Sequence, residues 1–312
     1  MIKKKDKIFL AGHKGLLGSA ILRNLKKMGF NNIITATSTK LDLRDQKLVE
    51  NFIKRTKPKL VIIAAAKVGG IYANDQLRAE FLYDNLSIQN NLINSSHQNN
   101  INELIFFGSS CIYPRDCKQP IKENYLLSGK LEKTNEPYAI AKIAGIKMIE
   151  SFNKQYKTDY ICLMPCNLFG PNDNYNLENS HFLPAIIKKI HLASEKKGKK
   201  IVKLWGTGKP LREILYVDEL ADACEFFLKK RIKKPLVNIG SPVEMTIKDY
   251  AKYIRSKIDP NVILKFDNNK KLDGVKRKKL NTSLANLYGW RSKMNFSKAL
   301  DYIIEDFKRS HK

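Results

Sequence analysis

Two short runs of this sequence hold side chains that could act on a carbonyl or an alcohol. In EPYAIAKIAG, residues 136–145, Tyr138 and Lys142 are four residues apart, a spacing that places them on one face of a helix. A nearby ammonium favours the phenolate, so we expect the pKa of Tyr138 to fall from about 10 toward neutrality. Such a tyrosine could give a proton to, or take one from, a substrate oxygen.

The second run, FFGSSCIYPRD at residues 106–116, ends an apolar segment in Ser109 and Cys111. Parallel strands deliver the residues at their carboxyl ends to a ligand crevice, where Ser109 could hydrogen-bond the same oxygen as Tyr138. If the strand geometry persists past Ser109, the two side chains point the same way. Cys111 is then either a thiol that takes part in proton transfer or a small buried apolar side chain.

A glycine-rich turn, AGHKGLLGSA, could bind a phosphate. Gly12, Gly15 and Gly18 are spaced three apart, after the first apolar run and at the start of an amphipathic helical pattern. Glycine permits the tight turn and lets backbone N–H groups approach a pyrophosphate at the helix N-terminus. A strand before the turn and a helix after it are the context that a dinucleotide site requires.

The end of the second expected strand, TATSTK, determines which dinucleotide fits. An acid that would hold the ribose 2′-hydroxyl of NAD is missing there. Lys14 and Lys40 could instead meet a 2′-phosphate, with Ser38 and Thr39 as hydrogen-bond donors. We therefore expect NADP. Asp42 lies past this strand and either contacts the adenine or caps the next helix.

The elements that must position these residues alternate between strands and helices. This alternation of strands and helices predicts an α/β fold with a doubly wound, parallel, Rossmann-like sheet. We expect strands at 7–12, 32–37, 59–66, 103–110, 160–170 and 235–240, and helices at 16–29, 45–56, 81–98, 137–156 and 217–229. Residues 1–170 would form the NADP-binding domain, with 214–242 returning to it. Residues 171–213 and 243–312 would mainly form a smaller C-terminal substrate lobe.

Composition excludes several other classes of protein. The 312 residues are 43% hydrophobic, enough for a sizeable core, and no apolar run is long enough to span a membrane. The start, MIKKKDKIFLAG, predicts a first strand rather than a signal peptide, so we expect a cytoplasmic protein. Five cysteines without CxxC spacing predict neither a disulfide framework nor a metal site.

The net charge of +27 could indicate a polyanionic partner. The lysines are spread along the chain, however, and no basic stripe is interleaved with aromatic residues. We therefore expect no nucleic-acid partner. A protein that bound nucleic acid on a vestigial cofactor fold would also be expected to have lost Tyr138 or Lys142.

With the glycine turn, Ser109, Tyr138 and Lys142, the chain resembles the extended short-chain dehydrogenase/reductase family. The runs AAAKVGGI, GSSCIYP, NEPYAIAKIAGIK, NLFGPNDN, NSHFLPA and WGTGKPLREILYVDEL extend this resemblance over nearly the whole chain. They are similar to members that convert GDP-4-keto-6-deoxy-mannose to GDP-L-fucose. The resemblance implies inversion at C3 and C5, reduction at C4 with NADPH, and a homodimer formed by helices that flank the sheet.

The resemblance also implies roles for individual residues. Cys111 and His181 stand at the positions of the base and acid of the inversions. Tyr138 would stabilise the enolate oxygen and later protonate O4, with Lys142 and Ser109 beside it. For His181, the alternative is a helix N-terminal residue that makes a local hydrogen bond.

The implied cofactor-binding residues come from the glycine turn and from the ends of successive strands. They are Gly12, His13, Lys14, Gly15, Leu16, Leu17, Gly18, Ser38, Asp42, Leu43, Ala64, Ala65, Ala66, Phe107, Gly108, Ser109, Ser110, Lys142, Pro165, Cys166, Asn167, Leu168 and His181. The implied GDP-sugar residues are Asn167, Lys189, Trp205, Arg212, Asp273 and Arg277.

Two positions depart from the family pattern. Arginine is usual where Lys189 stands, and lysine cannot form a bidentate fork with a phosphate. Arginine is also usual where Ser38 stands, so the NADP preference depends on Lys14 and Lys40. Another sugar-nucleotide 4-epimerase, reductase or 4,6-dehydratase remains an alternative, although a dehydratase would need a carboxylic acid beside Ser109, where the sequence reads SSCIY.

Overall fold

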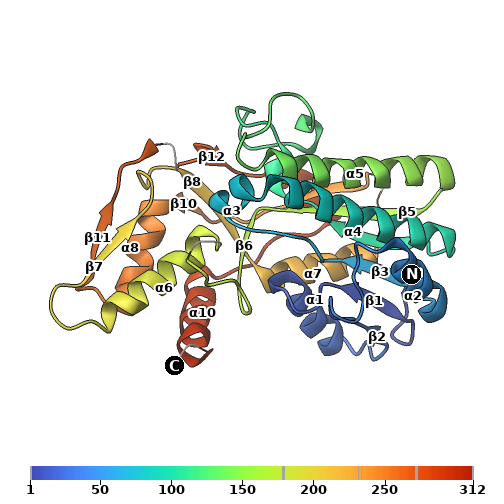
Figure 1. Cartoon of the computed structure of the whole chain (residues 1–312), viewed down its shortest axis with the longest axis horizontal. Helices are drawn as coiled ribbons and strands as arrows, with labels where there is room; N and C mark the ends of the chain where they lie inside the picture. The colour runs from blue at the N-terminus through green and yellow to red at the C-terminus, as the bar shows by residue number, and fades with distance from the viewer. Residues whose placement is uncertain (1, 178–179, 231, 233, 271–272, 311–312) are drawn as a thin grey trace.

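The computed structural model describes residues 2–177, 180–230, 232, 234–270 and 273–310, and Figure 1 shows a larger half and a smaller lobe. The larger half is built on a six-stranded sheet in which all neighbouring strands are parallel. In sheet order the strands are β2 (Ile33–Ile34), β1 (Ile8–Ala11), β3 (Leu60–Ile63), β4 (Glu103–Phe107), β5 (Asp159–Pro165) and β9 (Leu236–Ile239). The predicted parallel α/β sheet is confirmed.

Helices cover both faces of this sheet, which is why its strands are almost continuously apolar. In Figure 1, α4 (Arg78–Gln98) and α5 (Glu136–Tyr156) run along one face, and α1 (Leu16–Lys27) and α7 (Val217–Leu228) run along the other. The helix α2 (Gln46–Thr56) packs against α4.

The order of the strands reverses between β1 and β3. The chain moves outward from β1 to β2 and then continues with β3 on the other side of β1. Loops that follow two such strands diverge and leave a crevice at their carboxyl ends, the usual ligand site of open α/β sheets. The crevice is therefore expected beside the glycine turn.

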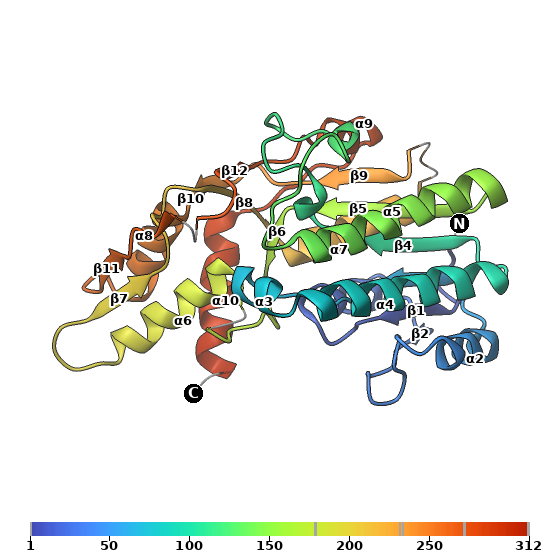
Figure 2. The ribbon, with the colours of Figure 1, turned by 45° about the horizontal axis from the view of Figure 1, so that its top comes forward.

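The smaller lobe has its own sheets and core (Figure 2). The strand β8 (Leu211–Tyr216) pairs with β6 (Asn167–Phe169), β10 (Glu244–Thr246) and β12 (Arg277–Lys278), while β7 (Ile201–Leu204) pairs with β11 (Ile263–Phe266). The helices α6 (Phe182–Ser194), α8 (Ile247–Ile258) and α10 (Phe296–Ser310) complete the lobe. Short helices that the sequence did not predict are α3 (Ile71–Gln76), α9 (Ser283–Tyr288) and the 3₁₀ turns Ser110–Ile112 and Glu123–Tyr125.

Four predicted strands were wrong in extent, including the one at 59–66, which ends at Ile63. The run 160–170 is divided, because β5 belongs to the main sheet and β6 leaves it to pair with β8. The strand predicted at 103–110 ends at Phe107, and the one at 32–37 is reduced to Ile33–Ile34. Since β8 lies in the lobe, the chain returns to the main sheet with α7.

The segment 280–290 lies outside the lobe core. Leu280, Ala285 and Trp290 belong to the core of the larger half, and α9 packs on β9. Among the helices in the described part of the chain, none combines the length and apolar character needed to cross a membrane.

Candidate active site

A cleft of about 700 Å³ opens at the carboxyl ends of the central strands. Its lining includes most of the residues expected at the cofactor. These are Gly12, Gly15, Leu16, Leu17, Ser38, Asp42, Leu43, Ala64, Ala65, Ala66, Phe107, Gly108, Ser109, Ser110, Lys142, Pro165, Cys166, Asn167, Leu168 and His181. Tyr138 also lines the cleft, whereas His13, Lys14 and Gly18 are not among its lining residues.

The glycine turn fits a bound pyrophosphate. Gly12 has φ +86°, and a Cβ there would lie 2.6 Å from the backbone nitrogen of Ala65, so only glycine is accommodated. A Cβ on Gly18 would lie 2.0 Å from the Gly12 carbonyl oxygen, which means that α1 packs directly on the turn. A Cβ on Gly15, in contrast, would meet only that carbonyl, at 3.6 Å. Gly15 begins α1 without a side-chain cap and lines the cleft, which leaves room for a phosphate group at the helix N-terminus.

At the adenosine end of the cleft, Ser38, Thr39 and Asp42 are lining residues, but the exposed Lys40 is not. Asp42 accepts two hydrogen bonds from the Arg44 guanidinium, at 3.0 Å from Nε and 2.8 Å from Nη2, and these bonds lower the pKa of its carboxyl. The alternative that Asp42 caps α2 was wrong, because Asp45 accepts the capping hydrogen bond. Arg44 also lines the cleft, and the sequence analysis did not identify it.

The chain beyond β4 brings Ser109 and Cys111 together. Ser109 Oγ lies 2.7 Å from Cys111 Sγ, within hydrogen-bond distance. The expectation that a continuing strand would align them was wrong, because the strand ends at Phe107 and residues 110–112 form a 3₁₀ turn. The turn folds Cys111 back onto Ser109, so the two side chains meet by a different geometry.

Tyr138 and Lys142 lie one turn apart on α5, with the Lys142 ammonium 5.8 Å from the centre of the phenol ring. Lys142 is buried, donates to the Phe107 carbonyl at 2.9 Å, and has its pKa lowered by burial to about 8. The pKa of Tyr138 is raised, mainly by burial and also by Cys111, while a hydrogen bond with Ser109 partly offsets this. The expected fall in the pKa of Tyr138 was therefore wrong, and the phenol is neutral in this structure.

His181 begins α6 and lines the cleft with an exposed side chain. It makes no side-chain capping bond, so the alternative of a local hydrogen bond is not observed. Surrounding protein atoms and the ammonium of Lys278 lower its pKa. Lys278, on β12, also interacts electrostatically with Cys111. The sequence analysis missed Lys278, because only strand pairing in the lobe brings its charge within reach of His181 and Cys111.

Two of the residues expected at the GDP-sugar meet on the lobe. The ammonium of Lys189 lies 4.9 Å from the centre of the Trp205 ring and donates to the Lys203 carbonyl at 3.2 Å. The ring of Trp205 is 54% exposed, so a large part of its surface is free to contact a base or a sugar.

Arg212 holds the loop that contains Asp273. Its guanidinium donates to the carbonyls of Val275 at 2.7 Å and Asp273 at 2.9 Å, and burial lowers its pKa to about 10. The Asp273 carboxylate accepts from the backbone N–H of Thr207 at 2.7 Å and from its hydroxyl at 2.8 Å. Arg212 forms no ion pair with Glu213 or Asp218, the nearest acids in the sequence.

Arg277 and Asn167 have other partners. Arg277 forms a two-bond ion pair with Glu244, at 2.9 and 2.8 Å, and no contact joins it to the Lys189 and Trp205 pair. The amide of Asn167 donates to the backbone carbonyl of Glu213 at 2.9 Å, which links the cleft to β8.

Comparison with known proteins agrees with this architecture. Residues 8–240 match the NAD dependent epimerase/dehydratase family. A protein described as "Putative GDP-L-fucose synthase 2" from Arabidopsis thaliana is 47% identical over 305 residues, which cover 98% of this chain and 92% of that protein. The GDP-L-fucose synthase of Escherichia coli (strain K12) is 42% identical over 307 residues, 95% of this chain and 94% of that protein.

Among solved structures, a GDP-mannoheptose C4 reductase from Campylobacter jejuni with NADP bound superposes with a TM-score of 0.90. The two chains are 36% identical, and the match covers 99% of this chain and 100% of the other. The family match spans most of the chain, and these relatives are similar over nearly all of it. The resemblance to extended short-chain dehydrogenases/reductases is thus confirmed, and this chain belongs to the NAD dependent epimerase/dehydratase family.

Proposed function

We propose that this protein converts GDP-4-dehydro-6-deoxy-D-mannose to GDP-L-fucose, by inversion at C3 and C5 followed by NADPH-dependent reduction at C4. The observation that carries this proposal is that Ser109, which lines the cleft with Tyr138, hydrogen-bonds Tyr138 and lies within hydrogen-bond distance of Cys111 behind it. A simple reductase needs the serine and tyrosine alone, whereas inversion beside a ketone also needs groups that move carbon-bound protons. The names of the curated relatives point the same way.

In the inversions, Cys111 takes a proton from the carbon next to the C4 ketone, and His181 returns one on the opposite face of the ring. Ser109 and Tyr138 hydrogen-bond the ketone oxygen and stabilise the negative charge that develops there. Lys278 adds a positive charge that interacts electrostatically with both His181 and Cys111.

In the reduction, NADPH supplies a hydride to C4 when it is bound in the cleft. Tyr138 gives its phenolic proton to O4, a role that requires the neutral phenol, and its raised pKa supports that form. Lys142 holds its ammonium against the Phe107 carbonyl, where it can stabilise the phenolate that remains. The cleft also fits NADP, because the acid that would select NAD is missing beside Ser38.

The GDP part of the substrate would lie across the lobe. Lys189, Trp205 and Arg212 supply an aromatic face and two cations for a base and a diphosphate, with Asp273 holding the loop between them. Arg277 would have to leave Glu244 before it could contribute.

A C4 reductase that acts on an already inverted sugar is the second candidate. It is favoured by one observation, the lowered pKa of His181, which reduces the fraction of this side chain that carries a proton to donate. An anionic substrate near His181 would raise that pKa again, so the epimerase-reductase remains the first choice.

The oligomeric state we propose is a homodimer formed by the outer surfaces of α4 and α5. Tyr83 on α4 is 69% exposed and Ile140 on α5 is 44% exposed, and paired copies could cover both. We place the protein in the cytoplasm, and the absence of disulfides among its five cysteines is consistent with a reducing compartment.

One incubation tests the proposed function. Purified protein is mixed in D₂O with GDP-4-dehydro-6-deoxy-D-mannose and either NADPH or NADH. The product is then analysed by chromatography and NMR. We expect oxidation of NADPH, formation of GDP-L-fucose, and solvent deuterium at C3 and C5. A product reduced at C4 without deuterium would favour the second candidate, and no turnover with either cofactor would refute both.

A further inference from the structure

A buried tyrosine lies at the far end of the turn that carries Cys111. Tyr113 is 3% exposed, follows Cys111 by two residues and does not line the cleft. Its hydroxyl donates a hydrogen bond to Asn238 Oδ1 at 2.6 Å. A buried phenol usually has such a partner, and here the partner lies on β9, 125 residues further along the chain. The reaction described above uses neither of these two residues.

Asn238 is a fixed acceptor, because the rest of its amide is also hydrogen-bonded. It is fully buried, and its Nδ2 donates to the carbonyls of Ile121 at 3.0 Å and Asn281 at 3.3 Å. Its backbone N–H donates to the Glu123 carboxylate at 3.0 Å. Rotation of the Asn238 side chain would break all of its side-chain bonds in a place that water does not reach, so the amide holds the Tyr113 hydroxyl in a defined position.

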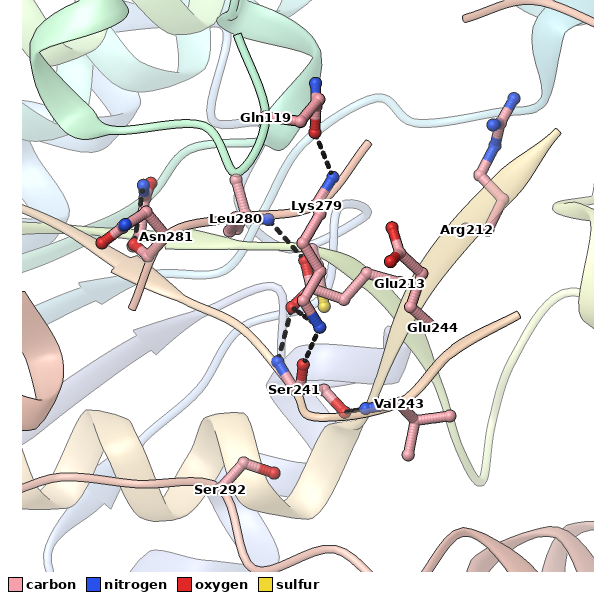
Figure 3. Close-up of polar contacts among 12 residues, drawn as sticks. Gln119, Arg212, Glu213, Ser241, Val243, Glu244, Lys279, Leu280, Asn281 and Ser292 are labelled. Atoms are coloured by element: carbon pink, nitrogen blue, oxygen red, sulfur yellow. Dashed lines mark hydrogen bonds and ion pairs between the residues drawn. The ribbon is translucent and has the colours of Figure 1, made fainter. Parts of the chain in front are cut away.

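The segment 279–281, which supplies one of these carbonyls, is itself held by a buried carboxylate (Figure 3). Glu213, on β8, is fully buried and accepts from the Leu280 N–H at 2.7 Å and from the Ser241 N–H at 2.7 Å. Asn281 follows Leu280 directly. Backbone groups from three segments that are distant in the sequence are therefore bonded to one another, and the surroundings of the Asn238 amide are well fixed.

The turn between β4 and Tyr113 has little freedom of its own. The N–H of Ile112 donates to the Ser109 carbonyl at 3.1 Å, and the Ile112 side chain is fully buried. Ser109 Oγ lies 2.7 Å from Cys111 Sγ. Because only Ile112 separates Cys111 from Tyr113, a shift of the tyrosine would change the backbone torsions on which this contact depends.

We infer that Tyr113 is a positioning residue that, through its hydrogen bond to Asn238, fixes the turn Ser110–Ile112 and holds the Cys111 thiol against Ser109. The effect of Tyr113 on the reaction passes through the backbone of the turn. What the held thiol does in the reaction rests on the proposed function, whereas the way in which it is held does not.

Hydrogen exchange tests the anchoring of the turn without any substrate. Tyr113→Phe removes one hydroxyl and leaves the buried oxygen of Asn238 without this donor. We expect amide exchange in the peptide 108–113, read by mass spectrometry, to become about tenfold faster in this variant. Exchange in the peptide 136–145 of α5 should stay unchanged. Unchanged exchange at 108–113, or equal acceleration in both peptides, would overturn the inference.

The two halves of the reaction give a second readout. The reduction should not depend on Tyr113, because β4 and α5 position Ser109 and Tyr138. In Tyr113→Phe, solvent deuterium incorporation at C3 and C5 should become about tenfold slower, while NADPH oxidation on a sugar already inverted at both carbons stays within about twofold. A purely structural role predicts equal loss of both rates. That result, or deuterium incorporation at the wild-type rate, would contradict the positioning role.

Tyr160→Phe is the matched control. Tyr160 is 1% exposed, lies near the amino end of β5 and does not line the cleft, and its hydroxyl donates to the Ile101 carbonyl at 2.8 Å. This variant therefore loses an equivalent buried hydroxyl far along the chain from the turn. Its exchange should become faster around Ile101, whereas the peptide 108–113 and both halves of the reaction should behave as in the wild type.

If Tyr113→Phe does not fold, Asn238→Ala removes the acceptor instead, with the same expected and refuting outcomes. Failure of this inference differs from failure of the proposed function. Faster exchange at 108–113 in the variant, with no turnover by the wild-type protein, would support the anchoring of the turn and overturn the proposed reaction. Normal wild-type turnover with unchanged exchange in the variant would overturn only the positioning role.

Discussion

Replacing Gly18 by alanine tests whether the close contact between α1 and the glycine turn shapes the cofactor site. The new Cβ would lie 2.0 Å from the Gly12 carbonyl oxygen, and an ordinary contact of 3.4 Å requires the two backbones to separate by about 1.4 Å. Alanine gains roughly 1 kcal/mol in helix propensity over glycine. Overpacking against an immobile backbone costs about 1–3 kcal/mol, so after the propensity gain the free energy of unfolding should fall by up to about 2 kcal/mol.

The same displacement moves the N-terminus of α1 away from the position where a pyrophosphate would bind. A misplacement of about 1 Å can change binding or rate about 100-fold, so NADPH affinity should fall by a factor of that order. Affinity is measured by quenching of NADPH fluorescence or by calorimetry, and stability by urea unfolding. Gly15→Ser is the control, because its Cβ would make only an ordinary contact, 3.6 Å from the Gly12 carbonyl oxygen, and serine is a favourable N-cap. It should weaken NADPH binding yet leave the unfolding free energy within about 0.5 kcal/mol. Wild-type stability and wild-type affinity in Gly18→Ala would refute the reasoning.

Four further outcomes are expected. Cys111→Ser should cut deuterium incorporation at C3 and C5 by about 100-fold or more while NADPH affinity stays unchanged, and full incorporation would remove the thiol from the reaction. Tyr138→Phe should slow NADPH oxidation by about 100-fold, measured on a substrate already inverted at C3 and C5; a smaller effect on deuterium incorporation would separate its two roles. Lys189→Arg should lower KM for the GDP-sugar with little change in kcat, because a guanidinium can bind a phosphate through two bonds; an unchanged KM would mean that Lys189 does not contact it. The pKa of Glu213 is raised by burial to about 7 from 4.5, so the folded state holds this proton more tightly than the unfolded state does. Its contribution to stability is therefore greatest below pH 4.5 and is lost as pH rises toward about 7, and the pH dependence of the urea midpoint between pH 5 and 8 should be shallower in Glu213→Gln.

The spacing of residues along the chain was sufficient to predict the parts of the candidate site that lie within one helix or one turn. The glycine spacing placed the phosphate-binding turn, because close backbone approach admits only glycine at Gly12 and Gly18. The four-residue spacing put Tyr138 and Lys142 on one face of α5, because helical geometry repeats locally. The fully apolar runs predicted a parallel sheet, because strands that are covered by helices on both faces are apolar along their whole length.

The direction of a pKa shift and the partners of a charged side chain could not be predicted from residue spacing. Proximity of Lys142 suggested a lowered pKa for Tyr138, yet burial reverses the direction, and burial depends on what the rest of the chain packs around the ring. Arg212 was expected to bind the GDP-sugar, but its guanidinium donates to backbone carbonyls of a loop about 60 residues away.

The sequence by itself therefore determined the class of fold, the tight glycine turn and the shared helix face of Tyr138 and Lys142, since each depends on spacing within a single segment. The role expected for Cys111 came from the family resemblance and stays a prediction. Tertiary structure alone decided that Ser109 and Cys111 meet through a 3₁₀ turn and that the charge of Lys278 acts on Cys111 and His181. It also decided that Glu213 is buried where three distant segments meet. The physical reason is that strand register and burial arise from contacts between segments far apart in the chain, and no local periodicity encodes them.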